Sequence, residues 1–238
     1  MQNTKSILLL LFAFTATLQL HAEDKTGTVT TRFQLEIDNA KGANLRSQTK
    51  VLVAMVEAKQ MAAADQKAVE LRRAYEAMFD KSLKQYTFQS QEEFKEFSKS
   101  SASKFEWIDW GYKECLQMQA FIAADRRDFP VALAILKTIE SVAPVSAGTA
   151  AETGYILNQS GNPREGLSAY RRAQALSEKY ASQRAYRAAA LRGIGYSLID
   201  LRRLDEAERI FLESLEIEPG NKTATNELAY IRAQHRSK

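Results

Sequence analysis

Few side chains in this 238-residue sequence could act as a nucleophile with a general base beside it. There is one cysteine, Cys115, and of the two histidines His21 lies in an apolar leading segment while His235 lies near the carboxyl end. A Ser–His or Cys–His pair needs a histidine close to the nucleophile, and a histidine near a chain end is usually solvated. Cys115 stands next to Leu116, which favours a small buried side chain over a reactive thiol. We therefore predict no catalytic pair of this type.

Two Glu-Ser pairs, Glu140-Ser141 and Glu213-Ser214, are the other candidates for chemistry. Such pairs are similar to those of lytic transglycosylases, some of which carry helical solenoids. No lysozyme-like domain accompanies the pairs in this sequence. They leave one alternative function open, that of an accessory subunit or hydrolase of cell-envelope or peptidoglycan metabolism.

The composition also argues against a metal site and a bound cofactor. One cysteine cannot form an internal disulfide or a cysteine-based zinc cluster, and two histidines are too few for a multi-histidine site. The pair Gly193-Ile-Gly195 lies in a helical pattern, where packing explains it better than a phosphate-binding loop does. We expect neither a metal nor a cofactor.

The first 22 residues have the pattern of a secretory signal peptide. Lys5 precedes an apolar run that begins at Ile7, and Ala22 stands just before the acidic Glu23-Asp24. The run is too short for a membrane span, which needs about 20 apolar residues. We expect cleavage after Ala22 and a mature chain in the periplasm or secreted, without an integral membrane span.

Basic residues are concentrated in one stretch, 171–203, although the whole chain carries a net charge of only +4. Only Glu178 and Asp200 oppose them there. The stretch is either a solvated helical surface or a docking face for an acidic partner. Nucleic acid is a poor candidate, because the chain is expected to be exported and has no basic-aromatic motif of the known modules. The basic residues are Arg171, Arg172, Lys179, Arg184, Arg187, Arg192, Arg202 and Arg203.

Three similar segments recur in the second half of the sequence. They centre on Ala132, Gly166 and Ala207, which are separated by 34 and then 41 residues. The seven extra residues are about two helical turns, enough to lengthen the two adjoining helices without rotating their faces. The segments resemble the tetratricopeptide repeat (TPR) family, whose unit is a 34-residue helix-turn-helix. The resemblance implies units 113–146, 147–180 and 188–221, an insertion at 181–187, and a capping helix at 222–238.

Small and bulky residues alternate in these units as close helix packing requires. Position 8 of each unit is small, and position 24 is bulky and fills the space beside that close approach. The expected fold is all-α, a TPR-type solenoid of about three repeats with a carboxyl-terminal cap, preceded by a mainly helical region at 23–112. The small residues are Ala120, Gly154 and Gly195, and the bulky ones are Leu136, Tyr170 and Phe211.

The resemblance implies that positions 2, 5, 9 and 12 of each first helix line a concave groove. Position 9 is aromatic in every unit and in the cap: Phe121, Tyr155, Tyr196 and Tyr230. Aromatic rings with polar tips favour a surface that meets a partner. The alternative is that the rings pack against each other or that the protein's own amino-terminal region occupies the groove. Neighbouring candidates at positions 5 and 12 are Gln117, Arg192 and Asn158.

TPR domains that bind the carboxyl ends of heat-shock chaperones have Lys and Asn at positions 5 and 9 of their first unit. This sequence has Gln117 and Phe121 there, so we do not expect that role. The leading hypothesis is an exported, non-catalytic scaffold that binds a protein or peptide in the aromatic groove. The sequence does not define an oligomeric state, and self-association through the cap or through 46–83 is a third possibility.

The amino-terminal region is less clearly patterned. Apolar residues spaced by three and four predict one long helix or two in series over 46–83. Ser90 and Glu93 form a possible capping box at the start of a short helix. The segment 33–37 alternates like a strand yet also fits a helix, and 86–88 is its only candidate partner.

Overall fold

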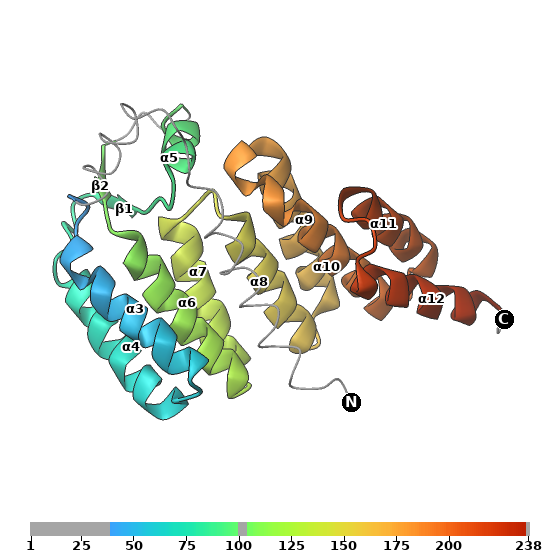
Figure 1. Ribbon diagram of the computed structural model, residues 1–238, viewed down its shortest axis with the longest axis horizontal. Helices are drawn as coiled ribbons and strands as arrows, with labels where there is room; N and C mark the ends of the chain where they lie inside the picture. Colours follow the sequence, from blue (N-terminus) through green and yellow to red (C-terminus); the bar gives the residue numbers. More distant parts are fainter. Residues whose placement is uncertain (1–38, 100–103, 237–238) are drawn as a thin grey trace. The chain divides into compact units, whose positions relative to one another are not determined.

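The computed structural model describes residues 39–99 and 104–236, whose course Figure 1 shows. Ten α-helices and one two-stranded sheet make up this described part. It divides into two compact units, one ending at Pro144 and the other beginning at Val145. The predicted signal peptide 1–22 and the segment 33–37 lie outside the described residues.

The first unit is built from helices α3 to α7, with one short strand on each side of α5. The stretch 46–83 contains two helices, and α6 packs against α3, α4 and α7. The predicted repeat array begins at residue 113, whereas compactness divides the chain after Pro144, because α6 shares its core with α3 and α4. The elements are the 3-10 helix η2 (Ala43–Leu45), α3 (Arg46–Glu57), α4 (Met61–Glu76), β1 (Lys84–Tyr86), α5 (Gln91–Ser98), β2 (Phe105–Trp107), α6 (Trp110–Asp125) and α7 (Phe129–Val142).

A buried carboxylate organises the core of the first unit. Asp109 is 0% exposed, caps α6 by accepting a hydrogen bond from the Gly111 N–H at 2.9 Å, and pairs with the Arg46 guanidinium at 2.6 Å. Arg46 begins α3, so this ion pair fastens the first turns of two helices to each other. Thr49 and Tyr75 continue the network, with 3.2 Å between their hydroxyl oxygens.

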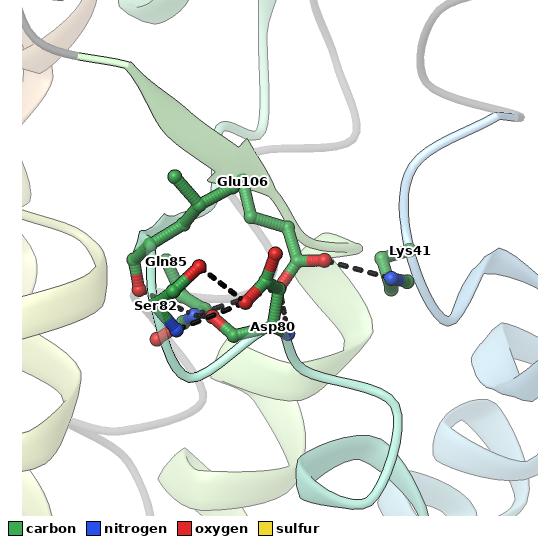
Figure 2. A network of polar contacts seen from close by, with 6 residues as sticks. Lys41, Asp80, Ser82, Gln85 and Glu106 are labelled. Carbon is green, nitrogen blue, oxygen red and sulfur yellow. Dashed lines mark hydrogen bonds and ion pairs between the residues drawn. The ribbon is translucent and has the colours of Figure 1, made fainter.

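The amino-terminal region is mainly helical, as expected, and it also contains two short strands. β1 and β2 form a parallel pair in which Lys84 lies opposite Phe105, and Lys41 adds an isolated bridge to Ile108. Figure 2 shows the polar contacts around this sheet: Glu106 pairs with Lys41 at 2.8 Å and accepts from the Asp80 N–H at 2.8 Å. Strands of three residues are too short to show a period of two, so the sequence pattern did not reveal them.

The helix between the two strands begins as predicted. Ser90 Oγ accepts from the Glu93 N–H at 3.1 Å, and the Glu93 carboxylate accepts from the Gln89 N–H at 2.7 Å, which confirms the capping box. Around α5 and the strands, aromatic rings pack with their centroids 4.7–6.0 Å apart. We call these rings the aromatic cluster: Tyr86, Phe88, Phe94, Phe97, Phe105 and Trp107.

The second unit contains two helix pairs and a final single helix. The insertion 181–187 does not lengthen its neighbours as expected. It forms a 3-10 helix, because Tyr180 is extended and ends α9, and the buried Gln183 side chain turns inward to accept from the Ala147 N–H at 3.0 Å. The elements are α8 (Ala147–Gln159), α9 (Pro163–Lys179), η3 (Ala181–Tyr186), α10 (Arg187–Asp200), α11 (Leu204–Ile217) and α12 (Lys222–Arg236).

Glycines let the helices of the second unit approach across aromatic rings. A Cβ at Gly154 would lie 2.7 Å from the Tyr170 ring, and one at Gly195 would lie 2.6 Å from the Phe211 ring. This confirms the predicted packing of a small position 8 against a bulky position 24. Gly193 is a further contact, since a Cβ there would lie 2.1 Å from the Tyr170 ring. The Tyr170 ring therefore passes between α8 and α10.

Four helix pairs close with the same turn. After α3, α6, α8 and α10, one residue adopts a positive φ, and two backbone hydrogen bonds reach back to the helix end, as in the Schellman motif. Glycine supplies that residue only once; elsewhere it is a lysine or an arginine, whose charge suits the negative end of the helix dipole. The residues are Lys59 (φ 58°), Arg127 (φ 61°), Gly161 (φ 82°) and Arg202 (φ 60°).

Candidate functional site

The residues considered for catalysis are buried, paired or solvated. Cys115 is 0% exposed, its thiol donates to the Ala68 carbonyl at 3.4 Å, and burial raises its pKa to about 12. Its thiolate is therefore disfavoured at neutral pH. His235 is exposed, 3.4 Å from Asp205. Ser214 is fully buried against the Ala188 carbonyl at 3.5 Å, so it presents no hydroxyl to a substrate.

The predicted groove residues are distributed over both units. Gln117 and Phe121 lie on α6 of the first unit, where Gln117 is half-buried and Phe121 is 2% exposed. The Phe121 ring therefore belongs to the core of its unit and offers no surface to a partner. A phenylalanine has no polar tip that would favour contact with water. The other five predicted residues lie on α8, α10 and α12 of the second unit: Tyr155, Asn158, Arg192, Tyr196 and Tyr230.

Two of these five side chains bind to other residues of the same chain. The Asn158 amide donates to Ser197 Oγ at 2.9 Å, which ties α8 to α10. The Arg192 side chain is 17% exposed and pairs with Glu218 at 2.6 Å, so a carboxylate of this chain already neutralises it. Both side chains hold the helices together more than they offer contacts to a partner.

The tyrosines of the second unit form the candidate site. Tyr196 is half-buried and lies edge-on to Phe211, with 5.6 Å between ring centroids. Tyr155 is half-buried, and Tyr230 is 40% exposed. Tyr170 comes from α9, and the pKa of its hydroxyl is raised by burial and by the electrostatic influence of Tyr155 and Tyr196.

Two carboxylates stand beside these tyrosines. Burial and, after it, the charge of Glu227 on α12 raise the pKa of the Tyr196 hydroxyl, and Asp200 lies one helical turn after Tyr196 on α10. Burial raises the pKa of Glu227, and the neighbouring Asp200 raises it further. We call this surface, made of Tyr155, Tyr170, Tyr196, Tyr230, Asp200 and Glu227, the tyrosine face.

Sequence reasoning missed three members of the tyrosine face. Asp200 and Glu227 fall one turn from position 9 of their helices, a spacing that could have indicated them. Tyr170 had been assigned to packing alone, because its repeat position does not show where the tip of a buried ring ends.

A carboxyl group of the first unit also escaped notice. Glu114 lies on α6 at position 2 of its repeat and is half-buried. Burial raises its pKa to about 7, with Asp109 acting in the same direction and Lys113 and Lys50 opposing. Such a group changes its charge near neutral pH.

The basic stretch 171–203 is partly neutralised within the chain. Arg187 pairs with Glu178 at 3.6 Å and with Glu213 at 3.1 Å, and Arg203 pairs with Glu206 at 2.6 Å. The side chains of Arg171, Arg172 and Arg184 are exposed on α9 and η3. The docking of an acidic partner here stays a prediction.

The helices of the described residues include none that is both long and apolar enough to cross a bilayer. Across 39–99 and 104–236, no group of three or more His, Cys, Asp or Glu side chains is arranged to hold a metal ion.

Comparisons with known proteins identify the fold. No protein-family model matches the chain, and no curated protein matches its sequence. The structure is similar to that of a putative kinesin light chain from Podosopora anserina with nearly identical TPR-like repeats, with a TM-score of 0.58 and 12% identity over 82% of this chain and 88% of that chain. A single-substitution form of that protein gives a TM-score of 0.58 and 11% identity over 83% and 89%. The first TPR of Spaghetti (RPAP3), bound to an HSP90 peptide, gives 0.44 and 18% over 55% and 98%.

The chain thus has the α-helical fold of TPR-like repeat proteins. The prediction of an all-α TPR-type fold is confirmed by this similarity and by the helix pairs themselves.

Proposed function

We propose that the protein is an exported scaffold that binds a protein or peptide on the tyrosine face and performs no chemistry. The observation that carries this proposal is the tyrosine at the same repeat position of three successive first helices, α8, α10 and α12, which is half-buried or exposed in each. Tyrosine combines a large rigid apolar ring with a hydrogen-bonding tip, which makes it frequent at the centres of protein interfaces.

Export rests on the signal-peptide pattern of residues 1–22, with cleavage after Ala22. The test is amino-terminal sequencing of the protein from the cell fraction that contains it. A first residue of Glu23 supports the proposal, and an intact Met1 in the exported fraction contradicts it.

Partner binding is tested by capture from the exported fraction with Tyr155→Ala and Tyr196→Ala variants. Each ring at the centre of an interface contributes ~1–2 kcal/mol, so each variant should recover about tenfold less partner. Arg209→Ala, an exposed residue of α11, is the matched control. An unchanged set of partners with an intact melting transition would contradict the proposal.

An envelope enzyme is the second candidate, and Glu114 is the observation in its favour. A single carboxylic acid with a pKa near 7 suits general acid–base catalysis of glycan cleavage. The test is digestion of isolated peptidoglycan by the wild type and by Glu114→Gln. Release of fragments by the wild type alone would support the enzyme, and no release by either would leave the scaffold.

A further inference from the structure

One exposed face of α9 carries basic and small side chains and no carboxylate. At about 100° per residue, five exposed positions of this helix fall within about 80° of its circumference, opposite the buried Ala173 and Ser177. From the first of these positions to the last, the helix rises by about 22 Å. We call this surface the basic face: Arg164, Ser168, Arg171, Ala175 and Lys179.

The two carboxylates of α9 stand at the borders of the basic face. Glu178 pairs with Arg187 at 3.6 Å and accepts a hydrogen bond from Gln174 Nε2 at 2.9 Å. Glu165 lies in the first turn of the helix, where the helix dipole stabilises a negative charge. The basic side chains are therefore not neutralised from within their own helix.

The cations of the basic face form no ion pair within 39–99 or 104–236, unlike three other arginines of the stretch 171–203. The Lys179 ammonium lies 4.8 Å from the centroid of the Tyr180 ring. Glu206 of α11, whose pKa is lowered first by Arg203 and last by Arg171, is bound to Arg203 at 2.6 Å. Three exposed cations on one helix face repel each other, so an anionic ligand would stabilise the arrangement. The three other arginines are Arg187, Arg192 and Arg203.

We propose that the basic face binds an acidic segment of a polypeptide partner. Guanidinium groups bind carboxylates through two parallel hydrogen bonds, which favours carboxylate side chains as the ligands. Ser168 and Ala175 are small, so a chain can approach α9 between the longer basic side chains. A length of about 22 Å corresponds to about seven residues of an extended peptide. The position-9 tyrosines lie on α8, α10 and α12, so this second surface goes beyond the proposed function.

A flat anionic membrane fits the basic face less well. A helix that lies on a membrane inserts apolar side chains into it, and the exposed large apolar residues of the described chain all lie on elements other than α9 and η3. In addition, α11 packs on α10 as α9 does, and it exposes Asp205 and Glu216. An anionic plane over both helices would meet these carboxylates, whereas a narrow acidic segment can follow α9 alone.

The test is fluorescence anisotropy of labelled peptides titrated with the purified protein. The probes are two peptides of about nine residues, one alternating glutamate with serine and the other glutamine with serine. The glutamate peptide should bind at least about tenfold more tightly, ~1.4 kcal/mol, and should weaken as ionic strength rises, because salt screens exposed charges. Equal binding of the two peptides would overturn the inference. Binding of phosphatidylglycerol vesicles without binding of the glutamate peptide would overturn it in favour of a membrane.

A triple variant locates the recognition. Arg164→Gln, Arg171→Gln and Lys179→Gln together should weaken the glutamate peptide at least about tenfold, while glutamine keeps a good helix propensity and hence the melting transition. The matched control removes the same charge from three exposed positions of α4, α7 and α11 and should change the affinity less than about twofold. An equal loss in the control would mean that net charge acts and that the basic face does not. The control substitutions are Arg73→Gln, Lys137→Gln and Arg209→Gln.

The tyrosine variants separate this inference from the proposed function. Tyr155→Ala and Tyr196→Ala change other helices and should leave the affinity for the glutamate peptide as in the wild type. If they lose a natural partner while the triple variant keeps the glutamate peptide, the scaffold stands and the basic face falls. If the partner is insensitive to the tyrosines while the triple variant loses the peptide, the basic face stands and the tyrosine face falls.

Discussion

Aromatic residues serve opposite purposes in the two units of this protein. In the first unit the rings of the aromatic cluster pack against each other, and the ring centroids of Phe94 and Trp107 are stacked 4.8 Å apart. Phe121 is buried in the helical core. In the second unit the rings at the same repeat position are tyrosines, and each is half-buried or exposed. A shared repeat position therefore does not define a shared role. The polar tip of a tyrosine allows its ring to stay at the surface, whereas the Phe121 ring has no such tip.

The largest difference in stability should come from truncating a position-9 ring in each unit, Phe121 in the first and Tyr230 in the second. Phe121→Ala leaves a cavity in the first unit and should lower the free energy of unfolding by ~3–5 kcal/mol. Tyr230→Ala removes a 40% exposed ring and should change it by less than ~0.5 kcal/mol. Urea denaturation measures both. Similar losses for the two variants would remove the contrast between the units.

A smaller effect is expected from closing the gap that the Tyr170 ring uses. Gly193→Ala places a Cβ against that ring, and the overpacking should cost ~2–3 kcal/mol. The double variant Gly193→Ala with Tyr170→Leu should cost less than the sum of the two single variants, since the smaller side chain relieves the clash. Thermal denaturation of the four proteins measures this coupling, and strict additivity would show that the two residues do not contact.

The pH dependence of stability should depend on Glu114 in the first unit. The folded protein holds the Glu114 proton with a pKa of about 7, while the unfolded chain holds it with a pKa of about 4.3. Because the folded state binds the proton more tightly, the stabilisation is complete below pH 4.3 and is lost as pH rises through 7, a change on the order of 3–4 kcal/mol.

The comparison variant is Glu114→Gln, which should be more stable than the wild type at pH 8 and should lack this slope between pH 5 and 8. Glu92→Gln, an exposed residue of α5, is the control and should retain it. Denaturation at both pH values checks the prediction, which fails if wild type and Glu114→Gln lose stability in parallel.

The sequence predicted the helix packing that recurs from one repeat to the next. Close packing of Gly154 on Tyr170 and of Gly195 on Phe211 follows from the spacing of small and bulky residues, and that spacing is a property of local helices. The sequence did not predict the elements that occur only once, the two strands and η3. The strands Lys84–Tyr86 and Phe105–Trp107 are held by partners distant in sequence, and η3 exists because Gln183 turns toward another helix.

The candidate site was predicted in part for the same reason. Tyr155, Tyr196 and Tyr230 are found by counting along the repeats. Glu227 belongs to the site because its charge acts on the Tyr196 hydroxyl from another helix, an influence that no single-helix pattern contains.

The left-handed turns at Lys59, Arg127 and Arg202 are positions at which the free energy of unfolding could still be increased. A side chain at such a φ costs ~1 kcal/mol relative to glycine, so each of these three positions holds mild strain that Gly161 avoids. Glycine substitutions at the exposed Lys59 and Arg127 would touch neither the core nor the tyrosine face, and together they offer an engineer a sturdier variant of the same repeat protein for structural work.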